Sequence, residues 1–362
     1  MILISQPFIG DEEKNAVLEV LSSGIVAQGP KVQEFEDRFA GYIGTEHAVA
    51  TNSGTAALHT ALLACGISMG DEVITTPFSF IASANSVLYC GAKPIFADID
   101  PKTFNIDPEE VKEKIGNNTK ALLIVHLFGQ PCEMDAIMEI CQDHKLVLIE
   151  DACQAHGAEY DMNEVGGFGR CAAFSFYPTK NMTTGEGGMI TTNDKIIAGK
   201  ARLLREHGSK TRYHHDALGY NYRMTDIAAA IGIEQLKKLE GMNERRIENA
   251  KDLTKGIKKI KGLASPYISP MVKHVFHQYT IRVNEEYGIT RGELVKKLSE
   301  KGIGSSVYYP LPIPSQELYK TLGYESRFPK AEQASKEVLS LPVHPKVSER
   351  EIELILSALT GN

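Results

Sequence analysis

Residues 146–158 read LVLIEDACQAHGA, an apolar run that ends in two acids, Glu150 and Asp151. A short apolar run bounded by polar residues predicts a strand that is buried on both faces. Ligands of open α/β sheets bind at the carboxyl ends of such strands. A carboxylate at that edge can hold a proton on a heterocyclic nitrogen, which an electron-sink cofactor requires. A capping aspartate at a helix start is the other interpretation of Asp151.

Apolar runs on both sides of this stretch alternate with amphipathic segments through the first two-thirds of the chain. The predicted strands are 72–75, 94–97, 121–127, 146–150, 172–176 and 189–192. The predicted helices are 55–65, 81–90, 108–115, 132–144, 196–206 and 224–240. Strands and helices in alternation imply βαβ units, so we expect an α/β fold with a mostly parallel central sheet flanked by helices.

The last third of the chain is richer in Lys and Glu and predicts a smaller α+β unit. A strand is expected at 276–283, and two capping boxes, Thr290-x-x-Glu293 and Ser348-x-x-Glu351, predict helix starts. We therefore expect a large domain at 1–245, with an N-terminal arm, and a small C-terminal domain at 246–362. The polar, aromatic segment 208–222 is a long connection, which is usually functional or an interface element.

Composition excludes several classes of protein. The 362 residues include 39 Lys and Arg against 46 Asp and Glu, a net charge of −7 that argues against a nucleic-acid-binding surface. The apolar runs are far shorter than a membrane span needs, and the N-terminus lacks the pattern of a signal peptide. The six cysteines form no C-x-x-C pair, which favours free thiols, no metal site and a cytoplasmic location.

A candidate reactive lysine lies in FSFYPTKNMTTGEGGMITT, residues 174–192. Ser175 ends a predicted strand, and Lys180 follows in a turn of small and polar residues. A lysine in a cleft, with its pKa lowered by its surroundings, can form a Schiff base with an aldehyde. A solvated surface lysine is the alternative.

A candidate phosphate site lies in TNSGTAALHTALLA, residues 51–64, where Ser53, Gly54 and Thr55 begin a predicted helix. A helix N-terminus offers free N–H groups and the positive end of its dipole, although an ordinary N-cap has the same residues. A phosphate cradle, an acid for a ring nitrogen and a Schiff-base lysine are together the requirements of pyridoxal 5′-phosphate chemistry.

With these three features, the sequence resembles the DegT/DnrJ/StrS family of nucleotide-sugar aminotransferases. The resemblance runs over nearly the whole chain in NSGTAAL, GDEVITTPFSFIA, GAKPIFADID, VHLFGQP, EDACQAHGA, FSFYPTKNMTTGEGGM, REHG, GYNYRMTDIAAAIG and LPVHP. It implies the fold-type-I architecture of aspartate aminotransferase, a pyridoxal 5′-phosphate-dependent enzyme and a cytoplasmic homodimer.

The resemblance also implies roles for single residues. Lys180 is the lysine that holds the cofactor aldehyde and then carries protons, and Asp151 is the partner of the pyridinium nitrogen. Gln154 is the partner of the ring hydroxyl. Phe80 lies over the ring face, with a core aromatic as the alternative. The implied phosphate binders are Ser53, Gly54, Thr55 and Ser175.

Segment 208–222 corresponds to the family's hairpin that crosses to the other subunit, where Asn221 would touch the partner's cofactor phosphate. The active sites would then be shared within a homodimer. The substrate phosphates would meet basic residues of this region, although solvated charges are the commoner explanation for His207, Arg212, His214 and His215. Arg223 would face either the carboxylate of the amino donor or an inter-subunit salt bridge.

The implied reaction has two halves. L-glutamate converts the cofactor to pyridoxamine 5′-phosphate and leaves as 2-oxoglutarate, and a keto sugar linked to a nucleoside diphosphate then accepts the amino group. Gln154 favours a 3-keto sugar and leaves a 4-keto sugar open. Tyr308 and Pro314 stand where many relatives carry histidines, which leaves the sugar-binding residues undetermined. A cyclitol ketone as substrate and a non-catalytic regulatory protein are the alternative functions.

Overall fold

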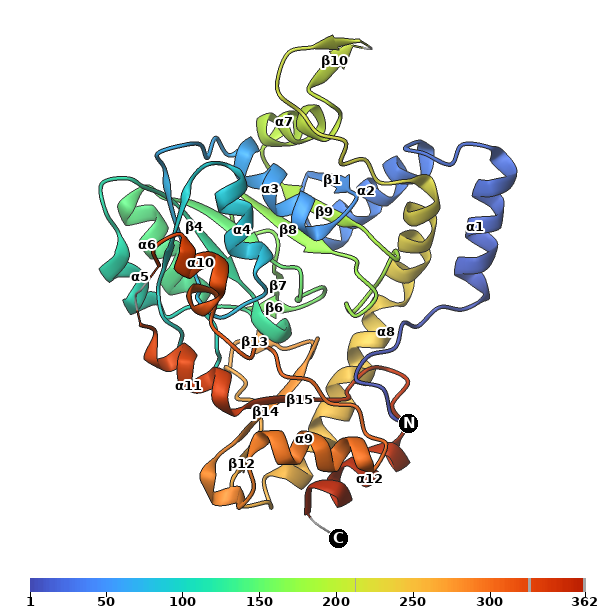
Figure 1. Ribbon diagram of the computed structural model, residues 1–362. Coiled ribbons are helices and arrows are strands. Elements are labelled where there is room, and N and C mark those ends of the chain that lie inside the picture. The colour runs from blue at the N-terminus through green and yellow to red at the C-terminus, as the bar shows by residue number, and fades with distance from the viewer. Residues whose placement is uncertain (212, 325–326, 361–362) are drawn as a thin grey trace.

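The computed structural model describes residues 1–211, 213–324 and 327–360. Its centre is a seven-stranded sheet in the order β1-β9-β8-β5-β4-β2-β3 (Figure 1). The five strands from β8 to β3 are parallel, whereas β9 runs antiparallel to both β8 and β1. The mostly parallel sheet confirms the expected fold class. Its strands are β1 (His47–Thr51), β2 (Glu72–Thr75), β3 (Lys93–Phe96), β4 (Thr119–Val125), β5 (Val147–Asp151), β8 (Cys171–Ser175) and β9 (Gly188–Thr192).

Helices cover both faces of this sheet, because successive side chains of a buried strand point to opposite faces. In β8, Phe174 packs with α2 and α8 on one face, while its neighbour Ala173 packs with α3 and α7 on the other. The helices of this region are α1 (Asp11–Ser23), α2 (Pro30–Ile43), α3 (Gly54–Ala64), α4 (Ala82–Tyr89), α5 (Pro108–Lys114), α6 (Met134–His144), α7 (Lys195–Arg205) and α8 (Asp226–Ile257), with a single 3₁₀ turn at η1 (Leu127–Gly129).

A carboxylate far away in the sequence caps helix α2. The Asp226 side chain, which is buried, accepts hydrogen bonds from the backbone N–H groups of Gly29, Lys31 and Val32 at 2.8, 3.1 and 3.0 Å. These are donors that have no partner inside the helix. The start of α8 is thereby joined to the start of α2.

The C-terminal part forms a three-stranded antiparallel sheet, β12 (Leu263–Ala264), β14 (Tyr279–Val283) and β15 (Val338–Leu341). Helices α9 (Arg291–Glu300) and α12 (Glu349–Thr360) and the end of α8 pack on it. Both predicted capping boxes are confirmed, since Glu293 accepts from the Thr290 N–H at 2.7 Å and Glu351 from the Ser348 N–H at 2.9 Å.

Helix α8 is longer than its sequence pattern predicts and continues to Ile257, so the expected boundary at residue 245 falls inside it. The division into domains stays a prediction. After the small sheet the chain returns to the large one, where Tyr319 and Phe328 pack against Phe78 and Phe96. The elements of this return are η3 (Ile313–Ser315), α10 (Glu317–Thr321) and α11 (Pro329–Glu337); a further 3₁₀ turn is η2 (Glu285–Tyr287).

Segment 208–222 contains a hairpin of β10 (Ser209–Thr211) and β11 (His214–His215) that projects from the body of the molecule (Figure 1). Arg212 lies outside the described residues. A further small sheet joins β6 (Glu159–Tyr160), β7 (Asn163–Glu164) and β13 (Val272–Lys273). Within the described ranges no helix has the length and apolarity to cross a bilayer, and no group of three or more His, Cys, Asp or Glu could hold a metal ion.

Candidate active site

A cavity of about 670 Å³ lies at the carboxyl ends of the parallel strands. It brings together all but one of the predicted site residues, although they are up to 127 residues apart in the chain (Ser53 to Lys180). The predicted residues on its wall are Ser53, Gly54, Thr55, Phe80, Asp151, Gln154, Ser175 and Lys180. Asn221 is not among its lining residues.

Asp151 is the last residue of β5 and is 4% exposed. One carboxylate oxygen, Oδ2, accepts a hydrogen bond from the Ser83 hydroxyl at 2.7 Å, and Oδ1 accepts from the Cys153 N–H at 3.1 Å. No helix begins after Asp151, so this aspartate caps none. Its two hydrogen bonds fix the direction in which the carboxylate faces the cavity.

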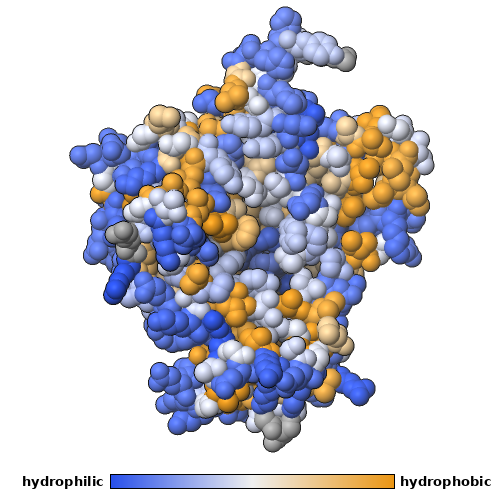
Figure 2. Space-filling view, in the orientation of Figure 1, coloured by the Kyte–Doolittle hydropathy of each residue, from blue (hydrophilic) through white to orange (hydrophobic). Residues whose placement is uncertain are grey.

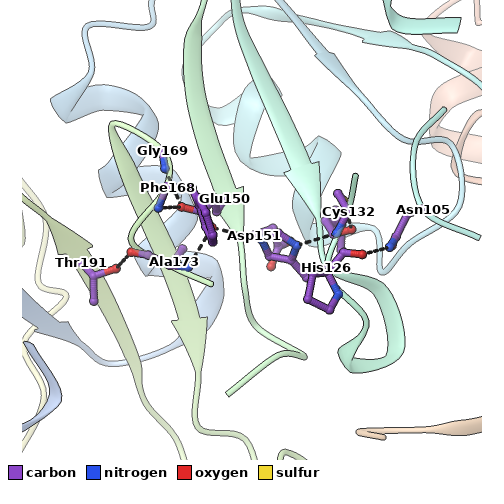
Figure 3. A network of polar contacts seen from close by, with 12 residues as sticks. Asn105, His126, Cys132, Glu150, Asp151, Phe168, Gly169, Ala173 and Thr191 are labelled. Atoms are coloured by element: carbon purple, nitrogen blue, oxygen red, sulfur yellow. Dashed lines mark hydrogen bonds and ion pairs between the residues drawn. The ribbon is translucent and has the colours of Figure 1, made fainter. Parts of the chain in front are cut away.

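The neighbouring Glu150 anchors the same strand end to the loop that contains Phe168 and Gly169 (Figure 3). Its buried carboxylate accepts hydrogen bonds from the N–H groups of Gly166, Phe168 and Gly169 at 2.7 to 2.9 Å. His126 Nδ1 accepts the Cys132 N–H at 3.1 Å, so Nε2 carries the hydrogen and donates to Glu150 at 3.1 Å. These bonds join the ends of β4 and β5.

Lys180 lies in the turn after β8, where its N–H donates to the Tyr177 carbonyl at 2.9 Å. Burial lowers the pKa of the Lys180 ammonium, because desolvation disfavours the charged form; Cys153 and Asp151 oppose this shift. Its side chain lines the cavity together with Asp151. The structure therefore favours a cleft lysine over a freely solvated one.

The start of helix α3 forms one end of the cavity. Ser53 is its N-cap and accepts the Ala56 N–H at 3.1 Å, which leaves the serine hydroxyl hydrogen free to donate. A methyl group at Gly54 would lie 2.6 Å from Ser175 Cβ and 3.2 Å from Cys153 Sγ. Only glycine permits this close approach of helix and strand, and the approach places the helix's free N–H groups beside Ser175.

Gln154 and Phe80 form another part of the wall. Gln154 Oε1 accepts the Phe128 N–H at 2.9 Å, and its Nε2 donates to the Tyr309 hydroxyl at 3.2 Å. Phe80 is 56% exposed, so it is not a core aromatic, and its ring lies 6.5 Å from that of Tyr309.

Sequence analysis missed several residues that complete the cavity. Ser83 lies inside the predicted helix 81–90 and was given no role, because its place one helical turn after Ser79 gives no signal for its bond to Asp151. His277 is 6% exposed, and its buried Nδ1 has no hydrogen-bond partner among the described residues. It belonged to a predicted strand that in the structure begins only at Tyr279. The chain turns at Phe276, whose φ is +46°, which ends regular strand geometry there.

The remaining predicted residues lie elsewhere. Asn221 is exposed, and its carbonyl accepts from the Asn52 side chain at 3.3 Å. His214 and His215 are exposed on the hairpin. Arg223 lines a separate cavity of about 290 Å³, which shares Glu186 with the first.

The residues present fit pyridoxal 5′-phosphate. The group needs an anion site, a carboxylate near a ring nitrogen and an amine near its aldehyde, which are the chemistries of the α3 start, Asp151 and Lys180. Because Gly54 has no side chain, the start of α3 lies close to Ser175, and its free backbone N–H groups supply the donors of the anion site. The Lys180 amine, which lines the cavity, is the group that such an aldehyde needs.

Comparisons with known proteins agree with this geometry. Residues 7–360 match the DegT/DnrJ/EryC1/StrS aminotransferase family. The GDP-perosamine synthase of Caulobacter vibrioides is 41% identical over 363 residues, which cover 99% of this chain and 97% of that protein. The crystal structure of DesV from S. venezuelae has 36% sequence identity and a TM-score of 0.93, and the match covers 99% of this chain and 98% of that one.

A putative sugar aminotransferase, Spr1654 from Streptococcus pneumoniae, has been solved in PLP and PMP forms. Its PLP form has 28% sequence identity and a TM-score of 0.93, with coverage of 99% of this chain and 98% of that one. The chain belongs to the DegT/DnrJ/EryC1/StrS aminotransferase family and is a pyridoxal phosphate-dependent aminotransferase.

Proposed function

We propose that this member of the family moves an amino group from L-glutamate to a keto sugar linked to a nucleoside diphosphate, in the biosynthesis of an amino sugar for a surface polysaccharide. The observation that carries the proposal is the single cavity that unites Lys180, Asp151 and the start of α3. The names of the relatives support the substrate class, since GDP-perosamine synthase is named for a nucleotide sugar.

Pyridoxal phosphate bound here would supply the electron sink on which an amino group moves from donor to acceptor. In this proposal Ser53, Gly54, Thr55 and Ser175 hold its phosphate. The Asp151 carboxylate, oriented by Ser83, holds a proton at the ring nitrogen. Lys180 Nζ binds the aldehyde and afterwards moves a proton at the reacting carbon, a task that its lowered pKa suits near neutral pH.

Gln154 would donate to the ring hydroxyl, and Phe80 would cover one ring face. The position of the keto group remains part of the proposal. Gln154 supports a 3-keto sugar, and a transaminase of Streptomyces venezuelae named for a dTDP-3-amino sugar is 37% identical over 96% of this chain. A 4-keto sugar is the competing substrate.

We further propose a homodimer with shared active sites, in which Asn221 reaches the partner's cofactor phosphate. Two features support it. The β10–β11 hairpin projects from the body, with Leu218 81% exposed beside it. The second is a set of exposed apolar residues, Leu18 and Leu21 of α1 with Ile25 and Val26 just after it; Figure 2 shows orange side chains gathered over the α1 region.

The test is a two-step incubation. The purified protein with pyridoxal phosphate is mixed with L-glutamate, and 2-oxoglutarate is measured; the desalted protein then meets a panel of 3-keto and 4-keto nucleotide sugars and cyclitol ketones. We expect release of 2-oxoglutarate and an amino sugar by mass spectrometry from the 3-keto substrates, and neither from Lys180→Ala. Turnover of 4-keto sugars or cyclitols alone would refute the proposed substrate, and a protein that binds no cofactor would refute the enzyme.

A further inference from the structure

The side-chain amide of Gln154 is held at both of its ends. Its oxygen accepts the backbone N–H of Phe128 at 2.9 Å, and its nitrogen donates to the hydroxyl of Tyr309 at 3.2 Å. A backbone N–H can only donate, so the amide cannot be turned round. The NH₂ group therefore points to Tyr309 and keeps a second hydrogen for a group bound in the cavity that Gln154 lines.

We call these two hydrogen bonds the Gln154 clamp. Its first end, the N–H of Phe128, lies just after β4 of the large sheet. Phe128 has a φ of +59°, an uncommon conformation for a bulky residue, which turns its N–H toward Gln154. The adjacent Leu127 N–H is bonded to Asn105 Oδ1 at 2.9 Å, and His126 is bonded to Glu150 (Figure 3). Buried hydrogen bonds thus hold the acceptor end of Gln154 in place.

The second end comes from a different part of the chain, 155 residues further on. Tyr309 lies three residues after Ser306, which pairs with Ser340 of β15 in the small sheet. Its ring packs near Phe78 and Phe80, at 6.1 and 6.5 Å between ring centres. The hydroxyl of Tyr309 therefore links the C-terminal part of the chain to Gln154 by a hydrogen bond.

We propose that Tyr309 is a positioning residue, which acts on the bound cofactor by fixing the Gln154 amide against the cofactor's ring hydroxyl. The inference rests on the proposed function, because that function supplies the group that Gln154 faces. Loss of the Tyr309 hydroxyl leaves the Phe128 bond intact but frees the NH₂ end to rotate away from the ring oxygen.

The experiment compares Tyr309→Phe with Tyr308→Phe. Tyr308 lines the same cavity, and within the described residues its hydroxyl makes no hydrogen bond. Tyr308→Phe therefore also removes one tyrosine hydroxyl from the cavity wall but leaves both hydrogen bonds of Gln154 in place. Cofactor-free proteins are titrated with pyridoxal phosphate to obtain Kd, and the visible absorbance of the bound cofactor is followed against pH. The other titratable groups on the wall stay unchanged in both variants; they are Asp151, Cys153, Tyr177, Lys180, Glu186 and His277.

A donor to the ring oxygen favours the form in which that oxygen carries most negative charge, so a weaker donor raises the pH midpoint of the absorbance change. We expect Tyr309→Phe to raise this midpoint by about 0.7 pH units, which is the size of one ordinary hydrogen bond, and to weaken Kd about threefold. Tyr308→Phe should leave both quantities at their wild-type values.

A Gln154→Ala background tests whether Tyr309 acts through Gln154. In that background Tyr309→Phe should shift neither quantity further. An equal shift with and without Gln154, or equal midpoints in the two tyrosine variants, overturns the inference while the wild type still binds the cofactor. Failure of the wild type to bind it overturns the proposed function instead. If Tyr309→Phe does not fold, Gln154→Glu, which has no hydrogen to donate, must raise the midpoint, and a wild-type midpoint there overturns the inference.

Discussion

Substitution of Gly54 by alanine should weaken cofactor binding through a shift of backbone alone. The added methyl carbon would lie 2.6 Å from Ser175 Cβ and 3.0 Å from Ser175 Oγ. Carbon atoms pack best at about 3.5–4.0 Å, so helix α3 and strand β8 must separate by about 1 Å. A hydrogen bond of about 2.9 Å that lengthens by this amount is no longer one.

The magnitude follows from these distances. Overpacking of this kind costs about 1–3 kcal/mol of folding free energy. The loss of one charge-assisted hydrogen bond to phosphate costs about 1.5–3 kcal/mol, which weakens the Kd for pyridoxal phosphate by roughly 10- to 100-fold. Both effects are measured on Gly54→Ala, by urea unfolding of the cofactor-free protein and by titration with the cofactor.

Gly199, inside α7, provides the matched control because no atom of the described ranges lies within 4 Å of a methyl group built there. Gly199→Ala should leave the Kd unchanged and stabilise the protein by up to about 1 kcal/mol. If Gly54→Ala retained the wild-type Kd, the start of α3 would not be the phosphate site, and our reasoning from its close approach to Ser175 would be refuted.

Three further predictions concern other parts of the molecule. The pKa of Lys180 is lowered in the folded state, so between that folded pKa and the unfolded value of about 10.4 the unfolded chain binds more protons. Lys180 therefore destabilises the cofactor-free protein increasingly as pH falls through this range. Lys180→Met should raise the urea midpoint most at the low-pH end of the range, and a gain that does not depend on pH would contradict this. Asp226→Asn retains one of two acceptor oxygens for three N–H donors at the start of α2, so it should lower the free energy of unfolding in urea by about 1–3 kcal/mol. Asp252→Asn, on the exposed side of α8, should lower it by under about 0.5 kcal/mol. Thr290→Ala breaks a capping box and should cost about 1 kcal/mol; no change would show that the Glu293 side chain alone caps α9.

Buried strands could be predicted from the sequence because their apolar runs are local signals. Six of the seven strands of the main sheet match predicted ranges within two residues at every end, and β2 matches its range without any difference. The run HAVAT of β1 was missed, since a five-residue strand with a polar start has a weak pattern. The end of α8 was missed because its last four turns are rich in Lys and Glu on the solvent side.

The residues of the candidate site also fall into those that local sequence indicates and those that depend on contacts between distant parts of the chain. Lys180, Asp151 and the start of α3 stand beside strand and helix ends, where local sequence indicates chemistry. Tyr309 and Asp226 act across 155 and about 195 residues, respectively, and no local pattern encodes such a contact. Asn221 stays a prediction, because its proposed ligand belongs to a second copy of the chain.

Helix α8 has a mechanical consequence for the whole molecule. Its 32 residues span about 48 Å without a proline or a break in its hydrogen bonds. One end carries Asp226, bonded to the start of α2, and the other end packs in the core of the small sheet. The small sheet and the base of α2 are therefore joined through one continuous helix.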